Sequence, residues 1–130
     1  MNKTVLLNNR ELSEVEVQSA REAIVAMGKE LIERKLVAGS WGNISVKIAD
    51  GVYAVTPSGR GYANQEPKDI VIIDNACSTL DGELTPSSES KLHTAIYSAC
   101  PEAKAIIHTH SIYASALAAM RKPVPAIIED

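Results

Sequence analysis

Two histidines separated by a single residue, His108 and His110, are the sharpest chemical signal in this sequence of 130 residues. The run 105–110 begins with apolar residues, which predicts a strand that leaves a hydrophobic core. Side chains at positions i and i+2 of a strand point to the same face, so the two imidazoles could bind one metal ion, and imidazole suits Zn²⁺. Polar residues at a strand end give the same pattern, and zinc needs at least three protein ligands, so the pair alone leaves both interpretations open.

A second signal is Glu89, an acidic residue within the serine-rich run 86–90. The hydroxyls of Ser87 and Ser88, together with free backbone N–H groups at the start of a helix, are typical of an anion site. Glu89 is expected in the first helical turn, where the helix dipole favours the ionised carboxylate. Serines that cap the helix and a glutamate that complements its dipole explain the same residues without any ligand.

Two glycine-containing segments, 39–45 and 56–59, are candidates for ligand-binding loops. In the first segment the glycines allow the backbone to approach a ligand closely, and Asn43 offers an amide. A plain turn ahead of a strand explains the first segment nearly as well. The second segment, Thr-Pro-Ser-Gly, is a turn by default and a phosphate-binding loop if it lies beside Ser87 and Ser88.

The third histidine, His93, lies four residues after Glu89 and is expected on the same face of the predicted helix. It could be a ligand. A packed or hydrogen-bonded structural role is commoner for a histidine in a helix and is favoured here.

An amphipathic helix is predicted to follow Ser13 and to run to about Leu36. Ser13 and Glu16 have the spacing of a capping box, and Gly39 is expected to end the helix. Apolar residues recur along it at steps of three and four: Val17, Ala20, Ile24, Met27 and Leu31. We interpret this stripe as a core or subunit contact.

Turn residues divide the rest of the chain into further elements. The Asp-Gly pair at 50–51 favours a hairpin between strands 43–48 and 52–56, and the β-branched run 69–74 predicts a buried strand. Helices are expected from Ser87 or Ser88 to about Ala99, and from Ser111 to Met120. This order of helices and strands predicts an α/β fold, with a mixed sheet and helices on its faces.

Composition sets the broad class of the protein. Hydrophobic residues make up 45% and charged residues 22%, which suits one globular domain, and the net charge of −3 gives no reason to expect nucleic-acid binding. No apolar run reaches the ~20 residues of a membrane span, and the apolar stretch at the N-terminus is too short for a signal peptide, so a cytoplasmic location is expected. Cys77 and Cys100 form no Cys-x-x-Cys pair and are expected to be reduced, partly buried thiols.

Four motifs in order give the sequence a family resemblance. They are Gly-Ser-Trp-Gly-Asn-Ile-Ser-Val at 39–46, Thr-Pro-Ser-Gly at 56–59, Pro-Ser-Ser-Glu at 86–89 and His-Thr-His at 108–110. This series resembles the class II aldolase/adducin family over nearly the whole chain. The resemblance implies a three-layer α/β/α fold around a mostly antiparallel sheet and, commonly, a tetramer. We therefore expect residues 1–130 to form a single domain of this type that lacks the C-terminal part of the family fold.

The resemblance also implies roles for individual residues. His108 and His110 match two of the three zinc histidines, and the third lies in a part of the family fold beyond this chain. Glu89 matches the catalytic acid/base, and His93 matches a position that is not a zinc ligand. The residues that match the phosphate cradle, or shape its loop, are Ser40, Gly42, Asn43, Ser58, Gly59, Ser87 and Ser88.

The activity implied is zinc-dependent cleavage of a ketose 1-phosphate, such as L-fuculose 1-phosphate, to dihydroxyacetone phosphate and an aldehyde. Zinc would stabilise the enediolate as a Lewis acid while Glu89 moves the proton. A closed site raises the pKa of such a carboxyl and a metal lowers it, so the direction of its shift stays open. The alternatives are a pentulose-phosphate 4-epimerase, or a catalytically inactive member that binds phosphate or serves as a scaffold. A homo-oligomer is expected in each case, with no nucleic-acid or membrane partner.

Overall fold

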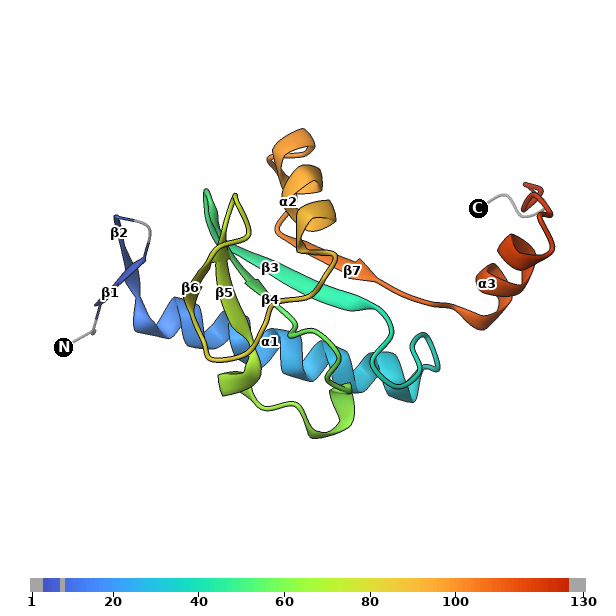
Figure 1. Ribbon diagram of the computed structural model, residues 1–130, viewed down its shortest axis with the longest axis horizontal. Coiled ribbons are helices and arrows are strands. Elements are labelled where there is room, and N and C mark those ends of the chain that lie inside the picture. Colours follow the sequence, from blue (N-terminus) through green and yellow to red (C-terminus); the bar gives the residue numbers. More distant parts are fainter. Residues whose placement is uncertain (1–3, 8, 127–130) are drawn as a thin grey trace.

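The computed structural model describes residues 4–7 and 9–126 and has three layers. A five-stranded sheet with the order β6-β5-β4-β3-β7 lies between helices α1 and α2 (Figure 1), and every described strand pair is antiparallel. The elements are α1 (Glu14–Glu33), β3 (Asn43–Ala49), β4 (Val52–Val55), β5 (Val71–Asp74), β6 (Thr79–Asp81), α2 (Ser90–Ala99) and β7 (Ala105–His108). The predicted α/β/α fold with a mostly antiparallel sheet is confirmed.

Several elements were not predicted from the sequence. A hairpin of β1 (Thr4–Leu7) and β2 (Arg10–Ser13) precedes α1. Two 3₁₀ turns, η1 (Tyr62–Asn64) and η2 (Pro67–Asp69), precede β5. The strand expected at 69–74 therefore begins two residues later, because Asp69 ends η2 and its carboxylate accepts a hydrogen bond from the Glu66 N–H.

The capping box that begins α1 is confirmed, but the helix ends earlier than predicted. Its last residue is Glu33 rather than a residue near Leu36. Lys35 adopts a left-handed conformation with φ 58°, and the Leu36 N–H bonds to the Leu31 carbonyl at 2.9 Å. This is a Schellman motif in which lysine occupies the position usually held by glycine, so Gly39 does not end the helix.

The two faces of the sheet differ in composition. The face against α1 is mainly apolar, with Ile44, Val52, Ala54 and Ile72 in one core cluster with Ile70 and helix residues. The face against α2 has a smaller apolar cluster of Tyr53, Val55, Val71, Ile73 and Tyr97. Asn43 and Ser45 of β3 are buried on this second face. Alternation along β3 thus gives one strand an apolar side and a polar side.

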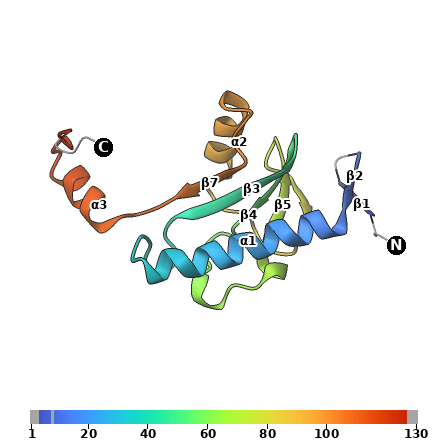
Figure 2. The same cartoon turned by 180° about the vertical axis from the view of Figure 1, so that it is seen from behind.

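The chain after β7 leads away from the sheet. In Figures 1 and 2 an extended segment carries α3 (Ile112–Ala119) to one end of the molecule, and α3 has no buried residue. Tyr113 is 83% exposed. Strand β7 ends at His108, two residues short of the predicted strand, and the helix expected from Ser111 to Met120 is present, with these two residues as its caps.

Two smaller expectations can also be compared with the structure. Cys77 and Cys100 are both free thiols, but only Cys77 is partly buried, whereas Cys100 is exposed. Among the helices in the described ranges, none combines the length and the apolar character that crossing a membrane demands.

Candidate active site

Glu89 lies where β3, β7 and the start of α2 meet. In the antiparallel pairing of β3 with β7, Asn43 is opposite His108, so their side chains share the face covered by α2. His108 Nδ1 is 2.7 Å from Glu89 Oε2, and Asn43 Nδ2 donates a hydrogen bond to the same oxygen. Oε1 of Glu89 accepts no hydrogen bond from any residue in the described ranges, and the side chain is 41% exposed, so one carboxylate oxygen remains available to a ligand.

The second predicted metal ligand, His110, lies next to His108 although it is outside the strand. The ring centroids of the two histidines are 4.9 Å apart. The His110 N–H bonds to the Leu36 carbonyl at 3.1 Å, which ties this residue to the segment after α1. The exposed Trp41 ring lies 5.5 Å from the His110 ring, centroid to centroid. The predicted same-side arrangement of the imidazoles is therefore present, although β7 itself ends at His108.

The remaining predicted residues line one pocket of about 230 Å³. It is bounded by Ser40, Trp41, Gly42, Asn43, Pro57, Ser58, Gly59, Ser87, Ser88, Glu89 and His110. His108 lines the adjoining hollow together with His110. The structure thus brings together every residue that the sequence motifs singled out for phosphate, metal or proton chemistry.

Backbone contacts hold the two serine-containing loops side by side. The Ser58 N–H bonds to the Thr85 carbonyl at 2.9 Å, and the Ser87 N–H bonds to the Thr56 carbonyl at 3.0 Å. Pro57 and Pro86 form an isolated antiparallel bridge between these bonds. The condition set for segment 56–59 to bind phosphate, that it lies beside the serines of 86–90, is therefore met.

Gly42 is required by its close contact with the backbone of the histidine strand. Its φ is +80°, and a Cβ at this position would lie 2.5 Å from the His108 carbonyl oxygen and 3.0 Å from a Val37 methyl group. An L side chain would be strained there and would push apart the loop and the strand that carries the first histidine.

The start of α2 differs from the prediction. The helix begins at Ser90, and Glu89 is its N-cap residue rather than a member of the first turn, so neither Ser87 nor Ser88 occupies the N-cap position. Ser87 instead supports the turn before the helix, because its hydroxyl accepts the Glu89 N–H at 3.2 Å and its carbonyl accepts the Ser90 hydroxyl at 2.7 Å.

The surroundings of Glu89 favour its ionised form. Its pKa lies below the ordinary value, mainly because the Asn43 amide donates to the carboxylate and also because of the hydrogen bond and charge of His108, while burial acts in the opposite direction. The sequence left the direction of the Glu89 pKa shift open, and in the chain by itself the pKa is lowered. An ionised carboxylate can accept a proton from a ligand.

His108 and His110 fit part of a metal site. The carboxylate at His108 Nδ1 leaves Nε2 free, and a carboxylate on the far nitrogen is typical of histidines that bind metals. Within residues 4–7 and 9–126, however, no group of three or more His, Cys, Asp or Glu residues converges to hold an ion. The donors present therefore supply two of the three or more ligands that zinc requires.

Sequence analysis missed a buried group of residues behind Glu89. His93 is 1% exposed and contacts Asn43 and Ser45, and Ser45 contacts Tyr97. His93 therefore has the packed, hydrogen-bonded environment that was favoured over metal binding. The spacing of His93 and Tyr97, four residues apart on one helix face, together with the alternation in β3, could have indicated this polar face.

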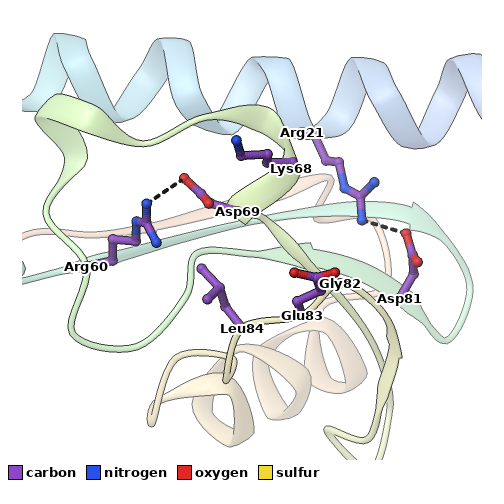
Figure 3. Close-up of a pocket in the computed structure, with 8 residues that line it drawn as sticks. All are labelled: Arg21, Arg60, Lys68, Asp69, Asp81, Gly82, Glu83 and Leu84. Atoms are coloured by element: carbon purple, nitrogen blue, oxygen red, sulfur yellow. Dashed lines mark hydrogen bonds and ion pairs between the residues drawn. The ribbon is translucent and has the colours of Figure 1, made fainter.

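A second pocket, of about 540 Å³, contains none of the predicted site residues. It lies between α1, η2 and the residues after β6 (Figure 3) and is lined by Arg21, Arg60, Lys68, Asp69, Asp81, Gly82, Glu83 and Leu84. Arg21 pairs with Asp81 at 2.6 Å, and Arg60 pairs with Asp69 at 3.5 Å. Most of its charges are therefore matched within the pocket itself.

Comparison with known proteins identifies the family to which this fold and these motifs belong. Residues 22–130 match the family described as Class II Aldolase and Adducin N-terminal domain, and the chain belongs to this family. A solved structure of an L-fuculose 1-phosphate aldolase superposes with a TM-score of 0.76 at 37% identity, over 83% of this chain and 51% of that one.

Two curated relatives show the range of activities among similar proteins. The 5-deoxy-D-ribulose 1-phosphate aldolase of Bacillus thuringiensis serovar kurstaki is 38% identical over 85% of this chain and 53% of its own length. The methylthioribulose-1-phosphate dehydratase of Methylococcus capsulatus is 36% identical over 92% of this chain and 57% of its own length. The chain thus spans about half the length of the curated relatives it matches.

Proposed function

We propose that this chain carries the phosphate-binding and proton-transfer parts of an aldehyde-lyase site. The substrate would be a ketose 1-phosphate of the L-fuculose 1-phosphate type, cleaved to dihydroxyacetone phosphate and an aldehyde. The observation that carries the proposal is Glu89, an ionised carboxylate with a free oxygen, between two adjacent imidazoles and a pocket lined by hydroxyl groups.

The phosphate group would be bound by neutral donors. The pocket contains hydroxyls of Ser58, Ser87 and Ser88 and no lysine or arginine among its lining residues. Asn43 donates one amide hydrogen to Glu89 and retains a second for the ligand. Anchoring the phosphate, which does not react, would orient the carbon skeleton against the carboxylate.

Glu89 would carry the proton in both directions. In the cleavage direction, ionised Glu89 would accept the proton of the hydroxyl that becomes the aldehyde oxygen as the neighbouring carbon–carbon bond breaks. The bonding electrons stay on the other carbon, which becomes an enediolate carbon. Glu89, now protonated, would return the proton to this carbon to give dihydroxyacetone phosphate. In the condensation direction, the ionised carboxylate removes that proton.

His108 and His110 would hold two positions on a Zn²⁺ ion, and the third ligand would come from outside the described residues. When bound, zinc supplies Lewis-acid stabilisation of the enediolate oxygens.

The test is an assay for dihydroxyacetone phosphate with the purified chain, with Zn²⁺ added, and with L-fuculose 1-phosphate and 5-deoxy-D-ribulose 1-phosphate as substrates. Production of dihydroxyacetone phosphate that disappears in Glu89→Gln supports the proposal. Turnover that survives in Glu89→Gln, or conversion of the substrate without carbon–carbon cleavage, contradicts it.

A second candidate is phosphate binding without turnover. It is favoured by one observation: residues of this chain line the hydroxyl-rich pocket, whereas two metal ligands, and not three, lie together among the described residues. Stoichiometric zinc that is lost in His108→Ala favours the lyase. A zinc-free, folded protein that binds inorganic phosphate, and binds it less tightly in Ser87→Ala, favours the second candidate.

A homo-oligomer completes the proposal. One side of β7 has no strand partner in the described sheet, and the side chains of α3 are uncovered within a single chain. Light scattering coupled to size-exclusion chromatography would contradict this part if the chain elutes as a monomer at tens of micromolar.

A further inference from the structure

A chain of hydrogen bonds connects the interior behind α2 to Glu89. The Tyr97 hydroxyl is 2.8 Å from Ser45 Oγ, which is 2.6 Å from His93 Nδ1. His93 Nε2 is in turn 2.5 Å from Asn43 Oδ1, and Asn43 Nδ2 donates to Glu89 Oε2. The four residues behind the carboxylate are each at most 4% exposed, so the protein alone determines how they are paired.

The chemistry of each group gives this series of hydrogen bonds a single direction. An ionised Glu89 only accepts hydrogen bonds, so Asn43 must turn its NH₂ group toward the carboxylate and its carbonyl toward His93. His93 must then carry its proton on Nε2.

The same reasoning continues on the other side of the imidazole ring. Nδ1 of His93 has no proton in this tautomer, so it accepts the Ser45 hydroxyl, which in turn accepts the Tyr97 hydroxyl. Each group donates toward Glu89, an arrangement in which successive hydrogen bonds strengthen one another.

Ser45, His93 and Asn43 have the connectivity of a nucleophile, a base and an orienting residue. Ser45 is nevertheless only 1% exposed, because its side chain lies on the sheet face that α2 covers. A substrate therefore does not reach its hydroxyl. The chain ends instead at the one member with an exposed side chain, Glu89. Its effect must therefore be exerted through that carboxylate.

We propose that His93 is a positioning residue for Glu89. As the Nε2-protonated tautomer, it fixes the side-chain amide of Asn43 so that the NH₂ group holds Oε2 of the carboxylate and leaves Oε1 toward the pocket. Tyr97 and Ser45 select this tautomer from behind. The inference rests on the proposed function only where it assigns proton transfer to Glu89, because the geometry can be measured without any turnover.

The burial of His93 supports the neutral ring that this arrangement needs. Burial is the main cause that holds its pKa below the ordinary value, nearby His108 acts in the same direction, and Glu89 acts in the opposite direction. A protonated imidazole would direct a hydrogen at Ser45 and reverse that half of the chain.

The first test is ¹⁵N-edited NMR of the full chain, with the His93 signals assigned by their absence in His93→Gln. The expected result at pH 8 is a neutral ring protonated on Nε2 and not on Nδ1. A ring protonated on Nδ1, or on both nitrogens, would overturn the proposal.

The second test compares variants by the exchange of the Asn43 side-chain NH₂ hydrogens with water. His93→Leu should speed this exchange, whereas His93→Gln, which keeps a donor near the Nε2 position, should restore slow exchange. Thr94→Ala is the matched control, because Thr94 is buried on the same helix as His93. Its hydroxyl bonds to Cys77 and to the Lys91 carbonyl, and not to any member of the hydrogen-bonded series. Equal exchange in wild type and His93→Leu would overturn the proposal.

Tyr97→Phe keeps the test decisive if His93→Leu does not fold. The ring at 97 stacks on Tyr53 at 4.6 Å, and phenylalanine preserves this contact. Removing only the outer hydroxyl should give the same changes at His93 and Asn43 on a smaller scale. Unchanged signals at both residues would count against the inference.

Activity provides the last readout. In the dihydroxyacetone phosphate assay, His93→Leu should lower kcat roughly tenfold with little change in KM, and His93→Gln should recover most of the loss. A change confined to KM would contradict a positioning role. If the wild-type chain does not turn over substrate, the lyase proposal fails, while the tautomer and the exchange rates still decide the role of His93.

Discussion

The pocket beside Glu89 and the pocket of about 540 Å³ beside α1 treat their charged groups in opposite ways. In the larger pocket (Figure 3), Arg21 faces Asp81 and Arg60 faces Asp69, so each of these carboxylates has a cation of its own. In the smaller pocket, Glu89 is held by an amide and an imidazole, and no lysine or arginine lines the site.

Under the proposed function, the difference separates a structural use of charge from a chemical one. Ion pairs near the surface cancel each other and contribute about 0–1 kcal/mol each to stability. Glu89 is held by the Asn43 amide and by His108, with no lysine or arginine lining its pocket, and buried hydrogen-bonded residues lie behind the amide. Similar residue types are therefore paired with each other in one region, and in the other they surround the carboxylate to which we assign proton transfer in the proposed function.

The largest expected effect comes from removing the charge of Glu89. We predict that Glu89→Gln lowers the rate of dihydroxyacetone phosphate formation about 10³-fold, because the base is lost, while the free energy of unfolding changes by less than about 0.5 kcal/mol. Kinetics and urea unfolding of the same samples measure both quantities. Asp81→Asn, which removes a carboxylate from the other pocket, is the control and should leave the rate unchanged. A Glu89→Gln enzyme with more than a tenth of the wild-type rate would erase the distinction between the pockets.

The next effect tests whether the smaller pocket depends on close backbone contact. Gly42→Ala places a Cβ 2.5 Å from the His108 carbonyl oxygen at φ +80°, so we expect a loss of roughly 3 kcal/mol in the free energy of unfolding. Gly59→Ala is the matched control, since Gly59 has a similar φ of +67° but no atom near its Cβ position, and it should cost only about 1 kcal/mol. Equal losses in urea unfolding would show that φ alone, and not the contact with the histidine strand, makes Gly42 necessary.

The parts of the site that could be predicted from the sequence are those with local signals. The His-x-His spacing, the serine pair and the glycine loops are each visible from neighbouring residues, and their order along the chain gave the family resemblance that implied a function. The Asp-Gly pair at 50–51 likewise predicted the hairpin of β3 and β4. The condition that joined the two serine-containing loops was also stated in advance, but only the bridge between Pro57 and Pro86 in the structure could show that it is met.

The parts that could not be predicted depend on contacts between distant segments. Ser45 and Tyr97 are unremarkable polar and aromatic residues in sequence, and they become part of the site only because β3 crosses beneath α2. The end of α1 escaped prediction for another reason. A left-handed lysine at position 35 has no signal in its residue type, and Gly39, which has one, lies four residues too late.

A smaller effect is expected from Tyr62, whose buried hydroxyl has no hydrogen-bond partner among the described residues. Burial raises its pKa to about 12. The unfolded chain loses this proton near pH 10 and the folded chain only near pH 12, so the contribution to stability is complete below pH 10 and falls as the pH rises toward 12. By pH 11 the loss should be about 1 kcal/mol. Tyr62→Phe should remove this pH dependence and cost little at pH 7, because it deletes an unsatisfied polar group. Parallel unfolding curves of both proteins between pH 9 and pH 11 would contradict the assignment.

The smallest effect returns to the paired charges. Asp81→Asn should lower the free energy of unfolding by at most about 1 kcal/mol, because the Asp81 side chain is 48% exposed and Arg21 keeps its second hydrogen bond, from Nε to the Ile70 carbonyl. The loss should shrink further in 1 M salt, where the Debye length is about 3 Å. Urea unfolding at low and high salt measures both values. A loss well above 2 kcal/mol that salt does not reduce would mean that the larger pocket also holds a desolvated charge for a purpose of its own, and the contrast between the two pockets would then have to be abandoned.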